Sequence, residues 1–214
     1  MDVQVEEAGR RRVRGPSPGK TAQTRKLIVA AALDTFVDQG FHPTRMIDVA
    51  ERAGVAKGTL YLYFADKEAL FEGVLGDVVA DLVSNMGESA PGPDESVRAF
   101  LARVVLPVLR TMESSRRAHF IRLVVTEGAR FPALANSYRR IFLDPVSELI
   151  RKLARRALAS GELTSDALLR FPLLLVAPGL LANVWNGHFG RDQPLDGGAM
   201  FEAYLDLVFG PGKT

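Results

Sequence analysis

The chain has 214 residues, with 27 Lys and Arg against 25 Asp and Glu, which gives a formal net charge of +2. Its 47% hydrophobic and 24% charged residues are typical of a globular protein and exclude a disordered or fibrous chain. The sequence contains no cysteine, which excludes a disulfide scaffold, a cysteine-ligated zinc site and a thiol nucleophile. The length suffices for one domain or two small ones.

The small net charge conceals a basic N-terminal segment. Residues 1–26 contain seven Lys and Arg against three Asp and Glu, whereas residues 27–90 contain four against ten. Residues 1–23 have few apolar side chains and include a Pro- and Gly-containing run, so we expect a flexible arm. No apolar stretch follows the charges, so the arm is not a secretory signal. It is either a solvated tail or a segment that contacts nucleic-acid phosphates.

Apolar residues at helical spacing predict an all-α chain. Ile28, Ala32 and Phe36 form one buried stripe, and Gly40 ends that helix. Asp66 is a suitable N-cap for a later helix. Turn signals separate the remaining segments. We expect helices over residues 24–40, 44–53, 56–64, 66–86, 94–112, 115–129, 132–160, 165–189 and 197–209.

The clearest break is the run Ala-Pro-Gly-Pro at residues 90–93, which we take as the boundary between residues 24–87 and residues 93–214. Beyond it, residues 171–190 carry no charge. Prolines and asparagines in this stretch argue against a membrane span. We therefore expect a helix that is buried in a core or between subunits and kinked at Pro178.

The most informative pattern lies in residues 44–64. Two short helices that meet at a tight turn need a small residue at their crossing, which Ala50 supplies, and a residue that tolerates positive φ, which Gly54 supplies. Leu60 supplies the apolar anchor on the second helix. This spacing is typical of a helix-turn-helix motif.

The polar face of the second helix favours DNA binding. Lys57, Thr59 and Tyr61 point away from its apolar face, and Gly58 has no side chain to obstruct close approach. Lysine reaches phosphates or guanine acceptors, threonine offers a hydroxyl or a methyl group, and tyrosine donates to phosphate. Such a helix suits the major groove of double-stranded DNA.

Residues 24–75 resemble the DNA-binding domain of the TetR family of bacterial transcriptional regulators. The resemblance is carried by Ile28–Leu33, Phe36, Gly40–Phe41 and the run from Thr44 to Leu70. Ala56 departs from it, because the family commonly has a capping serine there, and its absence costs about 1 kcal/mol of helix stability. The resemblance implies that the DNA-contacting residues are Thr44, Arg45, Lys57, Gly58, Thr59, Tyr61, Leu62, Tyr63 and Lys67.

Each of these residues has a structural alternative. Leu62 and Tyr63 can serve mainly in packing, and Lys67 can be a solvated charge. Thr44 and Arg45 would contact the DNA backbone. Because the helix dipole disfavours a cation at a helix start, we expect Arg45 and Lys67 each to have a bound phosphate as partner.

Residues 93–214 show no catalytic constellation. The three histidines are scattered, and no HExxH, GxSxG or phosphate-binding glycine loop occurs. We therefore expect no enzyme activity, no metal and no cofactor. The resemblance implies a helical bundle that binds an effector and dimerises through residues 165–189 and 197–209. The interface candidates are Leu173, Leu174, Leu180, Leu181, Val184, Trp185, Tyr204 and Leu207.

The segment Glu127–Pro132, followed by the long helix, resembles the AefR-like regulators. The candidate ligand-binding residues are mostly large and apolar, with two polar anchors, and each is alternatively an ordinary core residue. They are Phe100, Met112, Phe120, Arg122, Leu123, Phe142, Phe171 and Asn183.

The resemblance, together with these patterns, leads us to expect a cytoplasmic, homodimeric DNA-binding regulator. We expect a repressor that a small apolar effector releases from a palindromic double-stranded operator. The alternative is an effector-independent or architectural DNA-binding protein.

Overall fold

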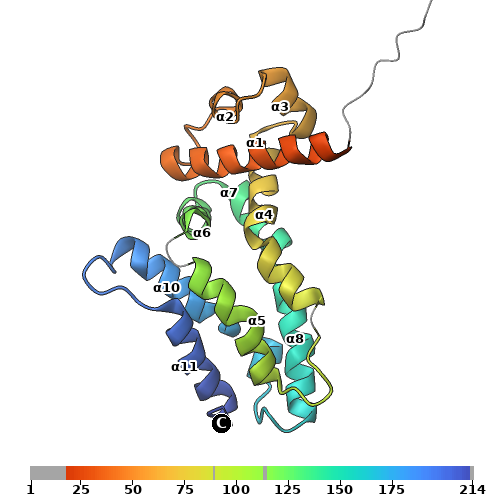
Figure 1. Ribbon diagram of the computed structural model, residues 1–214. Coiled ribbons are helices and arrows are strands. Elements are labelled where there is room, and N and C mark those ends of the chain that lie inside the picture. Colours follow the sequence, from red (N-terminus) through yellow and green to blue (C-terminus); the bar gives the residue numbers. More distant parts are fainter. Residues whose placement is uncertain (1–17, 89, 113–114, 213–214) are drawn as a thin grey trace, which may run out of the picture.

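A computed structural model describes residues 18–88, 90–112 and 115–212 (Figure 1). The predicted all-α fold is confirmed, since these residues form helices and no strand. Residues 1–17 of the expected arm lie outside the described residues, whereas residues 18–23 form the first turns of a helix. The N-terminal part contains α1 (Pro18–Gln39), α2 (Met46–Arg52), α3 (Lys57–Tyr63) and α4 (Lys67–Glu88).

The C-terminal part is a bundle of helices. Its elements, including the π-helical segment η1 and the 3-10 helix η2, are α5 (Val97–Met112), α6 (Arg116–Glu127), α7 (Pro132–Tyr138), η1 (Arg139–Leu143), α8 (Asp144–Ala159), α9 (Ala167–Arg170), η2 (Pro172–Leu175), α10 (Ala177–His188) and α11 (Gly197–Phe209).

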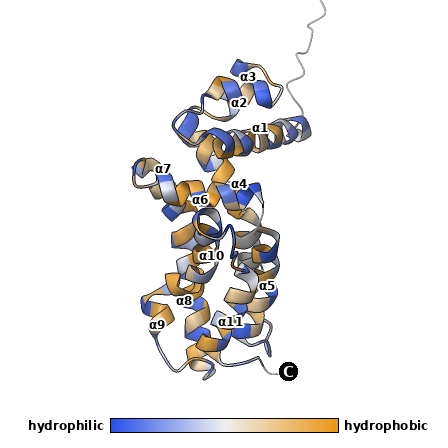
Figure 2. Ribbon diagram, turned by 90° about the vertical axis from the view of Figure 1, so that its left-hand side faces the viewer, coloured by the Kyte–Doolittle hydropathy of each residue, from blue (hydrophilic) through white to orange (hydrophobic). Residues whose placement is uncertain are grey.

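Helix α4 belongs to both parts. It packs on α1 near its start and on α5 and α8 further along, so it runs from the N-terminal part into the bundle (Figure 1). Asp66 caps it as predicted, accepting a hydrogen bond of 2.7 Å from the Ala69 amide. Figure 2 shows hydrophobic residues of α4 where this helix meets α1. Residues 90–93, the predicted boundary, lie in the loop after α4 and are not helical.

A cluster of phenylalanines joins the two parts into one core. The ring of Phe71 in α4 lies 5.7 Å from that of Phe36 in α1 and 4.9 Å from that of Phe120 in α6. Phe41 stacks on Phe36 at 5.8 Å. Three of these side chains are at most 1% exposed and Phe41 is 4% exposed. The N-terminal part is therefore packed against α6 and not attached by a flexible linker.

Two long predicted helices are interrupted. Residues 132–159 are helical, one residue short of the predicted end, but a π-helical turn, η1, separates α7 from α8. The single helix expected over 165–189 is wrong, because the chain forms α9, η2 and α10 there. Pro172 and Pro178 each occupy the first turn of a new helix. Backbone N–H groups in a first turn have no hydrogen-bond partner within the helix, so a proline there removes no hydrogen bond. Pro178 therefore starts a helix and does not kink one.

Candidate nucleic-acid interface and cavity

The turn between α2 and α3 has the expected chemistry. Gly54 has a φ of 66°, a left-handed conformation that glycine adopts without strain. The Val55 amide donates to the Ala50 carbonyl at 3.0 Å and closes the turn. Ala50 and Leu60 are fully buried where the two helices meet. Ala56 precedes α3 and provides no side-chain cap, as the sequence predicted.

One face of α3 is open to solvent. Lys57, Gly58 and Tyr61 are exposed, and Leu62 is 84% exposed, which is unusual for a leucine. A Cβ atom added at Gly58 would meet nothing within 4 Å, so nothing nearby in the described chain requires a glycine there. Thr59 and Tyr63 are half-buried. These two contribute to packing as well as to the rim of the exposed face.

Thr44 and Arg45 differ in what they can offer DNA. The Thr44 side chain is only 2% exposed, and its hydroxyl donates to the Gly40 carbonyl at 2.7 Å. Its hydroxyl proton is therefore used within the protein, and the DNA contact expected for Thr44 stays a prediction. Arg45 is exposed and pairs with Asp48 at 2.6 Å. This hydrogen-bonded pair lowers the pKa of Asp48 and leaves part of the guanidinium facing solvent.

Lys67 has main-chain partners. Its ammonium group donates to the carbonyls of Phe41 and His42, at 2.9 Å each, and lies 4.6 Å from the centre of the Phe41 ring. These partners compensate the ammonium charge within the protein, and a DNA phosphate contact stays a prediction for Lys67. Two carbonyls from the loop after α1 stabilise it at the start of α4, and it ties that loop to the helix.

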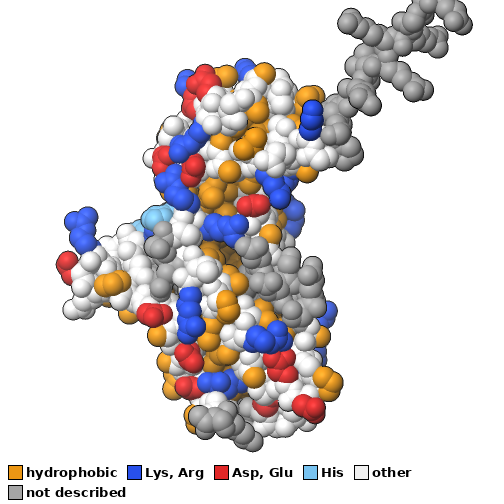
Figure 3. All heavy atoms as spheres, viewed as in Figure 1, with side chains coloured by type: hydrophobic (Ala, Val, Ile, Leu, Met, Phe, Trp, Pro, Cys, Tyr) orange, Lys and Arg blue, Asp and Glu red, His pale blue; other side chains and the backbone are white. Residues whose placement is uncertain are grey.

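Helix α6 is connected to α1 and α2 by charged groups. Arg116 donates to Asp34 at 2.8 Å and to Asp38 at 2.6 Å. Arg52 also pairs with Asp38, at 2.7 Å. Hydrogen bonds from Arg52 and Arg116 lower the pKa of Asp38. On the face of the molecule that Figure 3 shows, the cationic side chains are scattered and stand beside acidic ones.

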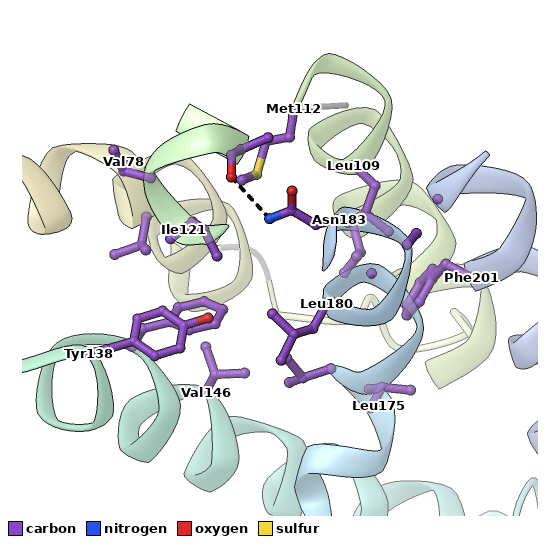
Figure 4. Close-up of a pocket in the computed structure, with 18 of the residues that line it drawn as sticks. Val78, Leu109, Met112, Ile121, Tyr138, Val146, Leu175, Leu180, Asn183 and Phe201 are labelled. Atoms are coloured by element: carbon purple, nitrogen blue, oxygen red, sulfur yellow. Dashed lines mark hydrogen bonds between the residues drawn. The ribbon is translucent and has the colours of Figure 1, made fainter. Parts of the chain in front are cut away.

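The bundle contains an apolar cavity of about 130 Å³ between α4, α5, α6, α8 and α10 (Figure 4). One water molecule needs roughly 10–15 Å³ by this measure, so there is room for a small organic molecule. The lining contains no charged side chain, and its polar side chains are those of Tyr138, Asn183 and Asn186.

The cavity contains three of the eight expected ligand-binding residues, namely Met112, Phe142 and Asn183. The other five do not line it, and a ligand-binding role for them stays a prediction. Phe100 and Phe120 are fully buried core residues, and Leu123 packs against the core. Phe171 is 58% exposed on the surface.

Arg122, the fifth residue outside the lining, acts on the cavity wall from behind. Its guanidinium donates to the backbone carbonyl of Asn183 at 2.8 Å and to the side-chain oxygen of Asn183 at 3.1 Å. Burial lowers the pKa of Arg122. Helix α6 is therefore hydrogen-bonded to a residue that lines the cavity.

Tyr138, Val146 and Ile150 also line the cavity, together with Phe142, and were not among the predicted ligand-binding residues. These residues recur every fourth position from 138 to 150, which is a readable signal. In a regular α-helix, each residue of such a row is rotated about the helix axis by about 40° relative to the one four positions before it. The wider turn of η1 reduces this drift and keeps the row facing the cavity.

The dimer-interface candidates divide into two groups. Leu180 lines the cavity, whereas Val184 and Tyr204 are half-buried. Phe189, whose ring lies beside that of Trp185, is 68% exposed and was not a candidate. The remaining candidates are exposed large hydrophobic side chains of η2, α10 and α11. They are Leu173, Leu174, Leu181, Trp185 and Leu207.

Among the residues that the structure describes, there is neither a candidate membrane span nor a candidate metal site. No helix there is long and apolar enough to cross a membrane. No three His, Asp or Glu side chains gather there as a metal site would require.

Known proteins resemble the chain over both parts. The HTH-type transcriptional regulator RutR of Escherichia coli (strain K12) is 51% identical over 55 residues, 26% of each chain, so the match spans about a quarter of RutR. The HTH-type transcriptional repressor KstR of Rhodococcus jostii is 27% identical over 196 residues, 89% of this chain and 85% of KstR. The crystal structure of the transcriptional regulator FadR from Bacillus subtilis in complex with stearoyl-CoA has a TM-score of 0.68 at 22% identity, covering 87% of this chain and 99% of FadR.

Two family models match the sequence itself. The model for bacterial regulatory proteins of the tetR family matches residues 28–74. The model for the tetracyclin repressor-like C-terminal domain matches residues 92–209, which is more than half of the chain. The matched families and relatives are regulators of transcription and not enzymes. The chain therefore belongs to the TetR family of DNA-binding transcriptional regulators.

Proposed function

We propose that the chain is a homodimeric repressor that reads a palindromic operator with α3 and is released from it by a small apolar effector in the cavity. The observation that carries this proposal is the position of α6. This helix is hydrogen-bonded to α1 through Arg116 and to the cavity wall through Arg122. A ligand that moves Asn183 thus acts on a helix attached to the DNA-binding part.

The exposed face of α3 supports its role in the major groove. Lys57 lies at the start of the helix, 5.9 Å from the centre of the Tyr61 ring, so both point to the same side. Leu62 offers an apolar contact for a thymine methyl group. Exposed Arg45 beside α2 is placed to contact a phosphate. Thr59 and Tyr63 would complete the surface from its rim.

The exposed apolar residues of α10 and α11 support dimerisation through these helices. Leu181 is 52% exposed and Leu207 is 84% exposed, and burying them against a second copy is favourable. Two α3 helices about 34–36 Å apart would then reach successive major grooves. We place the protein in the cytoplasm, where its DNA lies. The AefR-like character of the bundle stays a prediction.

The proposal is tested with an operator selected from a random DNA library by the purified full chain. Lys57→Ala should weaken operator binding at least tenfold and change base preference, because a contact in the groove is lost. The matched control is Lys152→Ala, since Lys152 is an exposed lysine on α8. Equal effects of the two substitutions would refute the role of α3.

Effector release is tested separately. A panel of small apolar molecules should contain compounds that both bind the protein and lower its operator affinity. Operator affinity that stays constant across compounds shown to occupy the cavity would favour the effector-independent DNA-binding protein.

A further inference from the structure

The cavity contains one polar group that the protein does not use. The Tyr138 side chain is only 7% exposed, and in Figure 4 its hydroxyl points into the open space between α6, α8 and α10. The hydroxyl makes no hydrogen bond with any described residue. Because the hydroxyl faces the cavity, this position is open to a hydrogen-bonding ligand atom.

The other polar side chains of the lining each hydrogen-bond to the protein. The Asn183 amide nitrogen donates to the Ala118 carbonyl at 3.1 Å, and its oxygen accepts from Arg122. Asn186 donates to the Leu195 carbonyl at 2.8 Å and accepts from the Leu195 amide at 2.7 Å. Among the described lining residues, Tyr138 therefore holds the one polar side-chain group that makes no hydrogen bond with the protein.

On this basis, and resting on the proposed effector role of the cavity, we propose that the effector is a neutral, largely hydrocarbon molecule with one oxygen, a hydroxyl or a carbonyl, that hydrogen-bonds to Tyr138. The remainder of the lining is aliphatic or aromatic and selects for a hydrocarbon body. Its lack of charged side chains disfavours an anion, because a buried charge without a partner is costly.

The tyrosine is held in place for this role. Its ring stacks on that of Phe142, with centres 5.4 Å apart and planes 28° apart, and η1 aligns these two residues on the cavity side. Burial raises the pKa of the Tyr138 hydroxyl, which keeps it protonated at neutral pH. It can then donate to a carbonyl or exchange a hydrogen bond with an alcohol.

The test compares 1-octanol, octane and octanoate as probes of wild type and Tyr138→Phe by calorimetric titration. In the wild type, 1-octanol should bind more tightly than octanoate. Tyr138→Phe should weaken 1-octanol binding about fivefold to tenfold, the value of one hydrogen bond, and leave octane binding unchanged. The variant should melt no lower than the wild type, since the removed hydroxyl has no partner. Tyr204→Phe, on α11 and outside the lining, is the matched control.

The outcomes separate this inference from the function on which it rests. Equal 1-octanol affinities in wild type and Tyr138→Phe, with octane still bound, overturn the role of Tyr138 alone. Octanoate binding more tightly than 1-octanol overturns the neutral class of ligand. If neither octane nor 1-octanol binds the wild type, the cavity is no site for apolar effectors, and both the inference and the proposed effector release fail.

Discussion

Gly58 offers a substitution with opposite expected effects on stability and on DNA binding. It lies in the first turn of α3, and an added Cβ would meet nothing within 4 Å. Alanine is more favourable than glycine in a helix by about 0.5–1 kcal/mol. Gly58→Ala should therefore raise the free energy of unfolding by about that amount, as measured by urea denaturation.

On DNA, the same methyl group lies on the exposed face of α3. Forcing an extra methyl group into a packed contact costs roughly 1–3 kcal/mol, which corresponds to an operator affinity about fivefold to 150-fold lower. Fluorescence anisotropy with the selected operator measures this loss. A variant that is more stable and yet binds less DNA cannot be explained by damage to the fold.

Gly76 supplies the matched control. It lies inside α4, where an added Cβ also meets nothing within 4 Å. Gly76→Ala should stabilise the protein by a similar amount and leave operator affinity unchanged. If Gly58→Ala binds the operator as well as Gly76→Ala does, α3 does not approach DNA closely at this residue, and the reasoning is refuted.

Three further results are expected. Lys67→Met should lower the free energy of unfolding by about 1.5–3 kcal/mol in urea denaturation, since it removes the charged hydrogen bonds to the carbonyls of Phe41 and His42. Unchanged stability would instead favour a role for Lys67 in DNA binding. Leu181→Glu should shift the protein toward monomer in light scattering, and an intact dimer would place the interface elsewhere. The Arg103 guanidinium lowers the pKa of Glu95 from 4.5 to about 2. The ionised Glu95 carboxylate therefore stabilises the fold above pH 4.5, and this contribution is lost as the pH falls to 2. In acid denaturation, the free energies of unfolding of wild type and Glu95→Gln should converge over that range.

The helix-turn-helix was predictable because its determinants are local. Ala50, Gly54 and Leu60 act within eleven residues of one another, and the turn needs little from the rest of the chain. Helix starts with a local cap were equally readable, as at Asp66. Pro172 and Pro178 gave a local signal too, but prolines both kink helices and start them, and only packing decides between the two.

The cavity was harder to predict because its walls come from distant parts of the chain. Large apolar residues such as Phe120 and Met112 look alike in the sequence, yet one lies in the aromatic core and the other on the cavity. Lys67 shows the same limit. Its position at a helix start signalled a missing partner, but the carbonyl of Phe41, 26 residues away, became visible only in the fold.

Charge position also explains how an acidic part of a chain can belong to a DNA-binding family. Residues 27–90 contain ten Asp and Glu against four Lys and Arg. Asp34 and Asp38 are paired with Arg52 and Arg116, where α1 meets α6. Helix α3 itself contains Lys57 and no acidic residue. Since salt screens exposed charges beyond about 8 Å at physiological ionic strength, phosphates at α3 would be governed by the groups beside them and not by the net charge of the domain.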